Sequence, residues 1–255
     1  MRIAELTTTT GQVPAGAALG VLLLVVASTV AAASAGAGKK EVFESEREVI
    51  EVEGWEVEMD VRLLRGDPES VAKGEKVMKV LGGQLFLISE LVPHEAVRAL
   101  QKTRIVVELE NPDRSGIEYH PHREWLQANG HSDRLWRTVH ISALDRFLSA
   151  EMRATQPMVI LHELSHAYHD QVLGFDEPEI RAAWERAKAA GTLEKVAFIR
   201  GGERRHYALV DHKEFFAEMT EAYFGTNDFF PFVKGELEAW DAETAKLMGN
   251  LWKVK

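Results

Sequence analysis

The chain has 255 residues, a length that suits one domain, and 45% of them are apolar, which is enough for a globular core. Forty acidic residues against 30 basic ones give a formal charge of −10. This balance argues against nucleic-acid binding, which depends on clustered Lys and Arg. The chain contains no cysteine, so disulfides, thiol catalysis and cysteine-ligated zinc sites are excluded.

Residues 1–37 are predicted to be a signal peptide. An apolar stretch is followed by small residues, with three overlapping A-x-A cleavage patterns between residues 31 and 37. The alternative is an uncleaved N-terminal anchor, because the apolar run 17–33 approaches the length that spans a bilayer. We therefore expect a secreted or periplasmic protein whose residues 41–255 form one domain. Membrane contact is expected only if the N-terminal segment is retained.

The first part of this domain is predicted to contain strands and one long helix. Partial alternation within 39–64 indicates one or two strands from about Val49. Apolar residues then recur at helical spacing over 68–91, with Gly82–Gly83 as a weak point. A short helix follows at 93–101, and the β-branched segment 104–110 is typical of a strand.

The second part is predicted to be mostly helical after a loop-rich segment, 111–138. The sequence "TVHIS" at 138–142 suits a short strand. Helices are expected over the segments 156–173, 177–191, 211–224 and from 235 to the C-terminus. Pro157 suits the first turn of the first of these helices and Gly174 suits its end. Strands followed by helices indicate the α+β class.

The segment "HELSH" at 162–166 lies on the helix predicted over 156–173. His162 and His166 are one helical turn apart, so both imidazoles face the same side and could hold one metal ion. Glu163 is close enough on the helix to reach a water on that metal, which is the logic of the H-E-x-x-H motif. The alternative is a helix with ordinary, satisfied polar residues. The apolar residues around the histidines disfavour that alternative, because buried polar groups need partners.

A third metal ligand is expected on the helix over 211–224. Glu214, Glu218 and Glu221 form a narrow acidic stripe on an otherwise apolar helix, which suggests carboxylates turned towards a metal. A capping box is the alternative for Glu214, with Asp211 as the N-cap residue. His169 follows the motif on nearly the same face as His162. It could approach the metal, although a position lining the cleft or bonded to a neighbour fits it better.

The combined pattern resembles the lethal-factor-like zinc metallopeptidases, a group of gluzincins that includes the anthrax lethal factor catalytic domain and the Pro-Pro endopeptidases. The shared features are H-E-x-x-H at 162–166, Tyr207, and seven residues later the segment "EFFAE" at 214–218. The segments 156–180 and 208–233 are also similar to putative secreted bacterial metallopeptidases. The resemblance covers residues 104–240, more than half of the chain, and implies a zincin-like metallopeptidase fold.

The resemblance also implies a role for each matching residue. His162, His166 and Glu214 would bind Zn²⁺, Glu163 would be the general base, and Tyr207 would stabilise the oxyanion. Glu218 would support a ligand histidine. The segment "TVHIS" could be the cleft-edge strand that pairs with a peptide or protein substrate, although ordinary sheet pairing or a plain loop fits it better. Because the large delivery and docking domains of lethal factor are missing, neither its targets nor a Pro-Pro preference carries over.

Several alternatives stay open at this point. Asp228, in "GTND" at 225–228, competes with Glu214, because aspartate-type zincins use a G-T-x-D segment, although Pro231 departs from that pattern. The domain could bind zinc without turnover, or it could hydrolyse a non-peptide cell-wall amide. Arginines before Tyr207 could bind a substrate carboxylate, but a solvated loop fits them better. Four other histidines could form a second metal site, but surface or core positions fit them better: His120, His122, His131 and His140.

Overall fold

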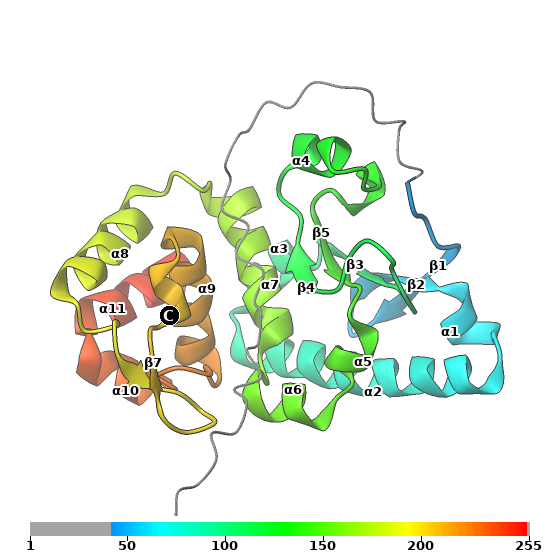
Figure 1. Ribbon diagram of the computed structural model, residues 1–255. Helices are drawn as coiled ribbons and strands as arrows, with labels where there is room; N and C mark the ends of the chain where they lie inside the picture. The colour runs from blue at the N-terminus through cyan, green and yellow to red at the C-terminus, as the bar shows by residue number, and fades with distance from the viewer. Residues whose placement is uncertain (1–41, 254–255) are drawn as a thin grey trace, which may run out of the picture. The chain divides into compact units, whose positions relative to one another are not determined.

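The computed structural model describes residues 42–253 of the chain (Figure 1). The predicted signal peptide, residues 1–37, and the alternative anchor over 17–33 lie outside the described residues. Between residues 42 and 253, no helix combines the length and the hydropathy that a membrane crossing requires.

A mixed five-stranded sheet forms one layer of the domain. Its spatial order is β1-β2-β3-β5-β4, so β1 and β4 are the edges. Pairing is antiparallel for β1 with β2 and for β5 with β4, and parallel for β2 with β3 and for β3 with β5. The strands are β1 (Arg47–Val52), β2 (Trp55–Asp60), β3 (Arg104–Val107), β4 (Ile117–Tyr119) and β5 (Thr138–Ile141).

Two helices after the β1–β2 hairpin match their sequence patterns closely. α2 runs from Pro68 to Leu91, as the apolar spacing predicts, and it continues through Gly82–Gly83 without a break. Asp67 caps its N-terminus by accepting hydrogen bonds from the N–H groups of Glu69 and Ser70. α1 (Val61–Arg65) precedes α2, and α3 (His94–Leu100) follows it after Pro93.

The helix α7 (Val159–Tyr168) lies between the sheet side and the C-terminal helices (Figure 1). It packs against β4, β5, α2 and α3, and also against α9 (His212–Phe224). The predicted start at 156 is wrong by three residues, and Pro157 precedes the helix. A π-helical segment, His169–Leu173, continues from α7 and ends at Gly174, whose φ of 86° suits glycine.

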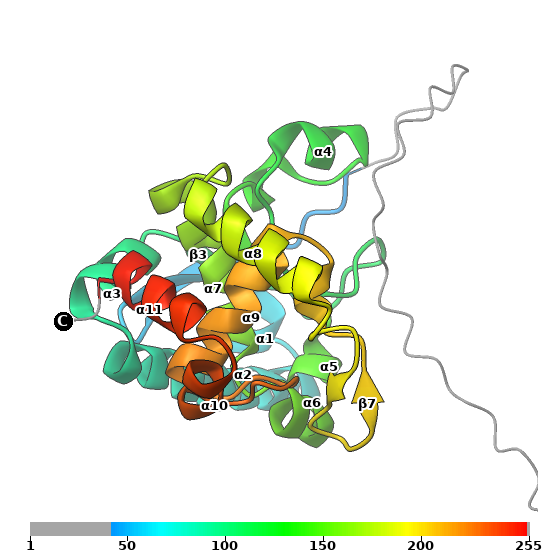
Figure 2. The same ribbon diagram turned by 90° about the vertical axis from the view of Figure 1, so that its left-hand side faces the viewer.

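The C-terminal helices form the other side of the domain (Figure 2). They are α8 (Pro178–Ala190), α9, α10 (Lys234–Trp240) and α11 (Ala242–Leu251). Trp252 is fully buried against the two central helices, with its ring 4.2 Å from that of Tyr168 on α7 and 5.7 Å from that of Phe216 on α9. This packing helps to fix α7 and α9 relative to each other.

The remaining elements are short. They are α4 (Arg123–Ala128), η1 (Asp133–Leu135), α5 (Leu144–Phe147), α6 (Ala150–Thr155), β6 (Val196–Ala197), β7 (Glu203–Arg204) and η3 (Tyr207–Leu209). β6 and β7 pair as a separate two-stranded sheet. The predicted α+β class is confirmed.

Candidate metal centre

Two histidines of α7 share one face of the helix. The rings of His162 and His166 lie 4.9 Å apart between centroids, and their side chains are only 12% and 13% exposed. Ile160, Leu161 and Leu164 are fully buried around them and anchor the helix in the core. The apolar sequence around the motif thus holds both imidazoles at a restricted opening to solvent.

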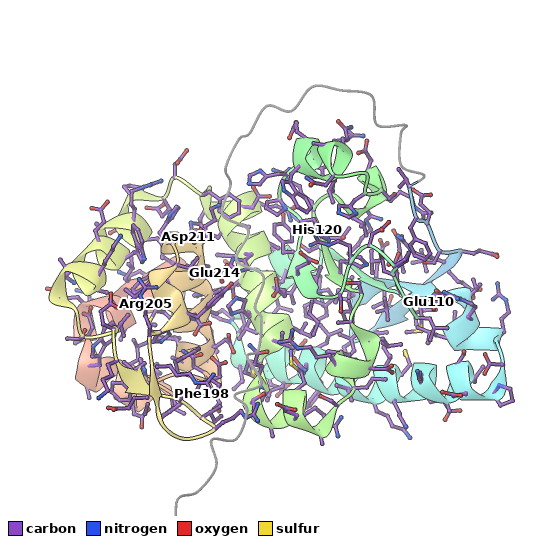
Figure 3. The ribbon with its side chains drawn as sticks, in the orientation of Figure 1. Glu110, His120, Phe198, Arg205, Asp211 and Glu214 are labelled. Carbon is purple, nitrogen blue, oxygen red and sulfur yellow. The ribbon has the colours of Figure 1, made fainter. Side chains whose placement is uncertain are left out.

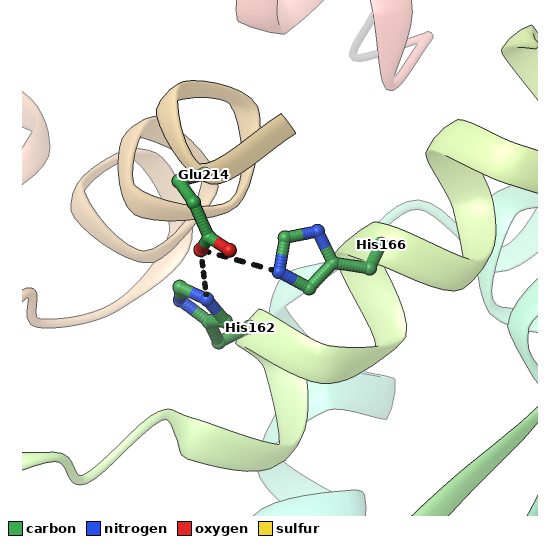
Figure 4. A group of neighbouring side chains, drawn as sticks. All are labelled: His162, His166 and Glu214. Atoms are coloured by element: carbon green, nitrogen blue, oxygen red, sulfur yellow. Dashed lines mark hydrogen bonds and ion pairs between the residues drawn. The ribbon is translucent and has the colours of Figure 1, made fainter. Parts of the chain in front are cut away.

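Glu214 projects from the first turn of α9 towards both histidines (Figure 4). Its Oε2 atom lies 3.1 Å from Nε2 of His162 and 3.4 Å from Nε2 of His166. Asp211 caps α9 by accepting hydrogen bonds from the main-chain N–H groups of Lys213 and Glu214, at 2.8 and 3.0 Å. Asp211 is therefore the N-cap residue, as the capping-box alternative required. The Glu214 carboxylate itself faces the histidines rather than closing a capping box.

The three side chains fit a divalent transition metal. Their ligand atoms all lie within 4.8 Å of one another. Zinc–ligand bonds of roughly 2.0–2.2 Å in a tetrahedron place ligand atoms about 3.3–3.6 Å apart. The two contacts of Glu214, at 3.1 and 3.4 Å, are close to this range. Two imidazole nitrogens and one carboxylate oxygen also leave one coordination position open, as catalytic zinc sites do.

Electrostatics favours the ionised form of Glu214 at this position. Burial alone would raise the pKa of its carboxyl group. The positive charge of the imidazoles of His166 and His162, together with their hydrogen bonds, outweighs burial and holds the pKa well below its usual value. The carboxylate is therefore charged and available as a ligand at neutral pH.

A second carboxylate lies behind His162, on the side away from Glu214. Oε1 of Glu221 is 2.7 Å from Nδ1 of His162, whereas Oε1 of Glu218, the residue expected from the sequence, is 3.8 Å away. Both carboxylates are buried, and together with His162 they form a second group whose atoms could hold a metal. The acidic stripe was visible in the sequence, but spacing alone did not show which of its members contacts the histidine.

Glu163 lies on the opposite flank of the motif, and one of its oxygens is occupied. The main-chain N–H of Tyr119 donates to its Oε2 at 2.8 Å, and within residues 42–253 no protein donor contacts Oε1. Burial raises the pKa of this carboxyl group. A buried carboxylate with one fixed and one free oxygen can exchange a proton with a neighbouring water.

Tyr207 stands at the start of η3, just before α9, and is half-buried. Burial raises the pKa of its phenol, and the charge of Glu214 adds to this effect, while that of His162 opposes it. The hydroxyl group therefore stays protonated at neutral pH. It lies close enough to the centre to sense the charges of both groups.

Within the described residues, neither alternative ligand is among the atoms grouped with His162, His166 and Glu214. Asp228 is buried, and burial together with the charge of Glu221 raises its pKa to about 7. His169 is fully buried among the rings of Phe175, His212 and Phe216, and neither of its ring nitrogens has a hydrogen-bond partner in the described part of the chain.

The other histidines occupy separate environments. His140 and His120 are buried and contact each other at 3.2 Å, and His140 also contacts Glu108 at 2.9 Å. The ring of His131 stacks on Trp125, and that of His122 lies 6.4 Å from the ring of Phe175. These positions agree with the prediction that the four histidines are core or surface residues rather than a second metal site.

The arginines before Tyr207 are engaged in local contacts. Arg200 pairs with Glu151, Arg205 with Glu194, and Arg204 lies over the ring of Phe198. In Figure 3, Phe198 lies at a distance from Asp211 and Glu214, which are at the N-terminal end of α9. The solvated-loop interpretation of these arginines fits their local contacts.

The edge strand beside the candidate metal centre is β4. The cleft-edge interpretation of "TVHIS" is wrong and the alternative of ordinary sheet pairing is correct, because β5 pairs with both β3 and β4 and has no free edge. The main-chain N–H of His120 donates to the carbonyl oxygen of Thr138, so this N–H points towards β5. The main-chain N–H of Tyr119 points away from β5 and donates to Glu163. β4 has only three residues within a polar loop, which gives too short a pattern to detect.

Searches against protein-family models, curated proteins and solved structures returned no match to this chain. The features that bear on function are the spacing of the three candidate ligand atoms, the carboxylate of Glu163 and the phenol of Tyr207.

Proposed function

We propose that the protein is a secreted zinc-dependent metalloendopeptidase with a zincin-like fold, related to the lethal-factor-like gluzincins. The observation that carries this proposal is the convergence of His162 Nε2 and His166 Nε2 on one oxygen of Glu214. The sequence places Glu163 directly after the first histidine, and no donor within residues 42–253 contacts its Oε1 atom. Together these features supply a metal site and a base beside it.

His162, His166 and Glu214 would hold the zinc ion, and Glu221 would orient the ring of His162 from behind. Bound zinc would acidify a water molecule and polarise the substrate carbonyl. Oε1 of Glu163 accepts the proton of the attacking water and later gives it to the departing amine. The hydrogen bond from Tyr119 N–H to Oε2 holds the carboxylate in place for both transfers.

The phenol of Tyr207 would act on the opposite side of the reacting carbon. Its raised pKa keeps the proton on the oxygen, so the group can donate a hydrogen bond to the developing oxyanion. Such a donor stabilises the transition state more than the ground state, because negative charge forms only as the bond to water forms.

The free edge of β4 suits an extended peptide. Backbone groups that point away from β5 lie on the same side as Tyr119 N–H and can pair with a substrate strand. This position, next to α7, would place a peptide bond beside Glu163 and the metal ligands.

Two other functions remain as rivals. A module that holds zinc without turnover would not need the free oxygen of Glu163 or the protonated phenol near it, so both features favour an enzyme. Hydrolysis of a non-peptide cell-wall amide would use the same residues and differs only in substrate. Export depends on the segment 1–37, which lies outside the described residues.

The test combines metal analysis with hydrolysis of an unfolded protein. We expect about one zinc per chain after gentle purification, cleavage of the unfolded protein, and loss of cleavage with a chelator that zinc restores. Glu163→Gln should keep the metal and lower the turnover by at least about 10²-fold. Absence of bound transition metal, or full activity of Glu163→Gln, would overturn the proposal. A metal-loaded protein that cleaves cell-wall fragments but no peptide would identify the amidase rival.

A further inference from the structure

A cavity of about 170 Å³ opens beside the metal centre, with His166 and Glu214 in its wall. Its other walls come from the end of β4 and the loop after it, from the segment that follows the π-helical turn, and from the N-terminus of α9. The residues that matter for its chemistry are Tyr119, His122, Phe175, Asp211 and Lys213. Because two metal ligands border it, a side chain that enters the cavity belongs to a residue close to the scissile bond.

Lys213 gives this cavity a positive charge in a defined position. Its main-chain N–H is held by Asp211 at 2.8 Å, and its ammonium group lies 4.8 Å from the centroid of the Phe175 ring. Within residues 42–253, no carboxylate lies within 4.0 Å of this ammonium group. In contrast, Lys73 pairs with Asp145 and Lys195 with Glu203. Among the described residues, Lys213 thus has an aromatic neighbour but no ion-pair partner.

The acidic groups in the same wall are already engaged. Asp211 Oδ1 accepts two main-chain hydrogen bonds at the start of α9, where the helix dipole also favours its charge. Glu214 Oε2 faces His162 and His166. Among the residues that line the cavity, Lys213 is the one lysine or arginine, so it carries the one positive charge that does not depend on the protonation of a histidine.

We propose that this cavity binds a carboxylate of the substrate residue next to the scissile bond, and that Lys213 is the residue that selects it. The inference rests on the proposed peptidase function and names its substrate class. The carboxylate can come from an Asp or Glu side chain or from the free C-terminus of a short peptide, and both would face the same ammonium group. The ring of Phe175 lines the apolar part of the path, while Lys213 provides the charge.

The first experiment reads cleavage sites in a randomised peptide library, prepared with free and with amidated C-termini. The wild-type protein should enrich Asp and Glu at one position flanking the cleaved bond by about two- to fivefold over Asn and Gln, the range for a partly solvated ion pair. Lys213→Met should remove this enrichment, Lys213→Arg should keep it, and Lys213→Glu should favour Lys and Arg. Enrichment that appears only with free C-termini would assign the cavity to the terminal carboxylate.

Lys188→Met is the matched control, because its ammonium group also lies over an aromatic ring, 4.7 Å from that of Trp184, but on α8 away from the cavity. This variant should keep the wild-type preference. Zinc content should be equal in all of these proteins, which excludes damage to the neighbouring ligand Glu214. Cleavage by Lys213→Met with an unchanged acidic preference would overturn the inference, as would a wild-type protein that cleaves without preference.

A binding experiment separates this inference from the proposed function. Glu163→Gln retains the cavity, so its affinity for labelled peptides that differ only by Glu or Gln can be measured without turnover. A preference for the Glu peptide that disappears in Glu163→Gln with Lys213→Met would support the inference even if the wild-type protein cleaved no peptide. Equal affinities for the two peptides would contradict it.

Discussion

Glu221 holds the ring of His162 from behind, with Oε1 of Glu221 2.7 Å from Nδ1 of His162. A carboxylate at this distance accepts the Nδ1 proton, so a neutral ring would present an unprotonated Nε2 to a metal ion held together with Glu214 and His166. This is the orientation that a metal ligand needs, because a second hydrogen bond fixes both the tautomer and the ring plane. The contact therefore links the buried side of α9 to the ligand face of α7.

Glu221→Gln should weaken zinc binding about 10- to 100-fold, because the amide accepts the Nδ1 proton less strongly than the carboxylate does. Competitive titration against a chromophoric chelator measures this change. Glu218→Gln is the control and should have a smaller effect, because Glu218 lies 3.8 Å from the same nitrogen. If Glu218→Gln weakened binding more than Glu221→Gln, the assignment of the two carboxylates would have to be exchanged.

The different roles of these two glutamates illustrate how far the sequence could predict the site. Residue spacing on one helix brought His162 and His166 together and placed Glu214, Glu218 and Glu221 on one stripe. Which member of the stripe meets the ring depends on the crossing angle and the offset between α7 and α9. Those are set by packing against residues distant in the sequence, such as Trp252.

The fold shows the same division. The helix over Pro68–Leu91 was predictable to the residue, because its apolar spacing, its cap at Asp67 and the following Pro93 all agree. The edge strand β4 was not predictable, because three residues cannot display an alternating pattern. Its place is fixed by pairing with β5 and by the bond from Tyr119 to Glu163. Local sequence patterns therefore predict the long helices, whereas the position of the short edge strand β4 depends on contacts with residues distant in the sequence.

Tyr207→Phe should lower kcat by about 10²- to 10³-fold, the cost of removing one oxyanion donor. Zinc occupancy should not change, because the phenol is not among the grouped ligand atoms. Steady-state kinetics on one peptide, with metal analysis of the same samples, measures both quantities. Tyr223→Phe is the control: this tyrosine lies near the far end of α9, with its ring under Lys234, and its kcat should match the wild type. A wild-type kcat in Tyr207→Phe would exclude Tyr207 from the mechanism.

A buried ionic network around Glu108 should make the stability of the domain fall at low pH. Glu108 is fully buried, with Oε1 2.6 Å from Arg47 and Oε2 2.9 Å from His140. Burial would raise the pKa of Glu108, but the hydrogen bond and charge of His140, with further help from Asn111 and Arg47, lower it below its usual value. A depressed pKa stabilises the fold above the unfolded value of about 4.3, and this contribution is lost as pH falls through the folded pKa.

Glu108→Gln should therefore cost about 3–5 kcal/mol at pH 7, because it leaves a buried charge without its main partner. The difference from the wild type should shrink as pH is lowered from 5 to 3. Urea unfolding at several pH values measures both effects. Glu48→Gln is the control: Glu48 pairs with Arg65 on the surface, so its loss should change stability by less than about 1 kcal/mol. An equal cost for Glu108→Gln at pH 7 and pH 3 would show that ionisation of Glu108 contributes nothing.

The third metal ligand is decided by comparing Glu214 with Asp228. Glu214→Ala should weaken zinc binding by more than about 100-fold, the upper range for residues that merely support a ligand. It should also lower the stability of the metal-loaded protein, because metal binding is coupled to folding. Asp228→Ala should leave the affinity near the wild-type value. With a pKa of about 7, raised by burial and by Glu221, Asp228 is only partly ionised at neutral pH and is a poorer ligand than the charged Glu214.

Competitive zinc titration of both variants, with circular dichroism to verify folding, separates the two assignments. Glu214→Gln serves as a second variant, since it keeps the size of the side chain and removes the charge. If Asp228→Ala loses zinc while both Glu214 variants keep it, Asp228 is the ligand. The contact of Glu214 with His162 and His166 would then be an ordinary buried ion pair, as its distances of 3.1 and 3.4 Å would also allow.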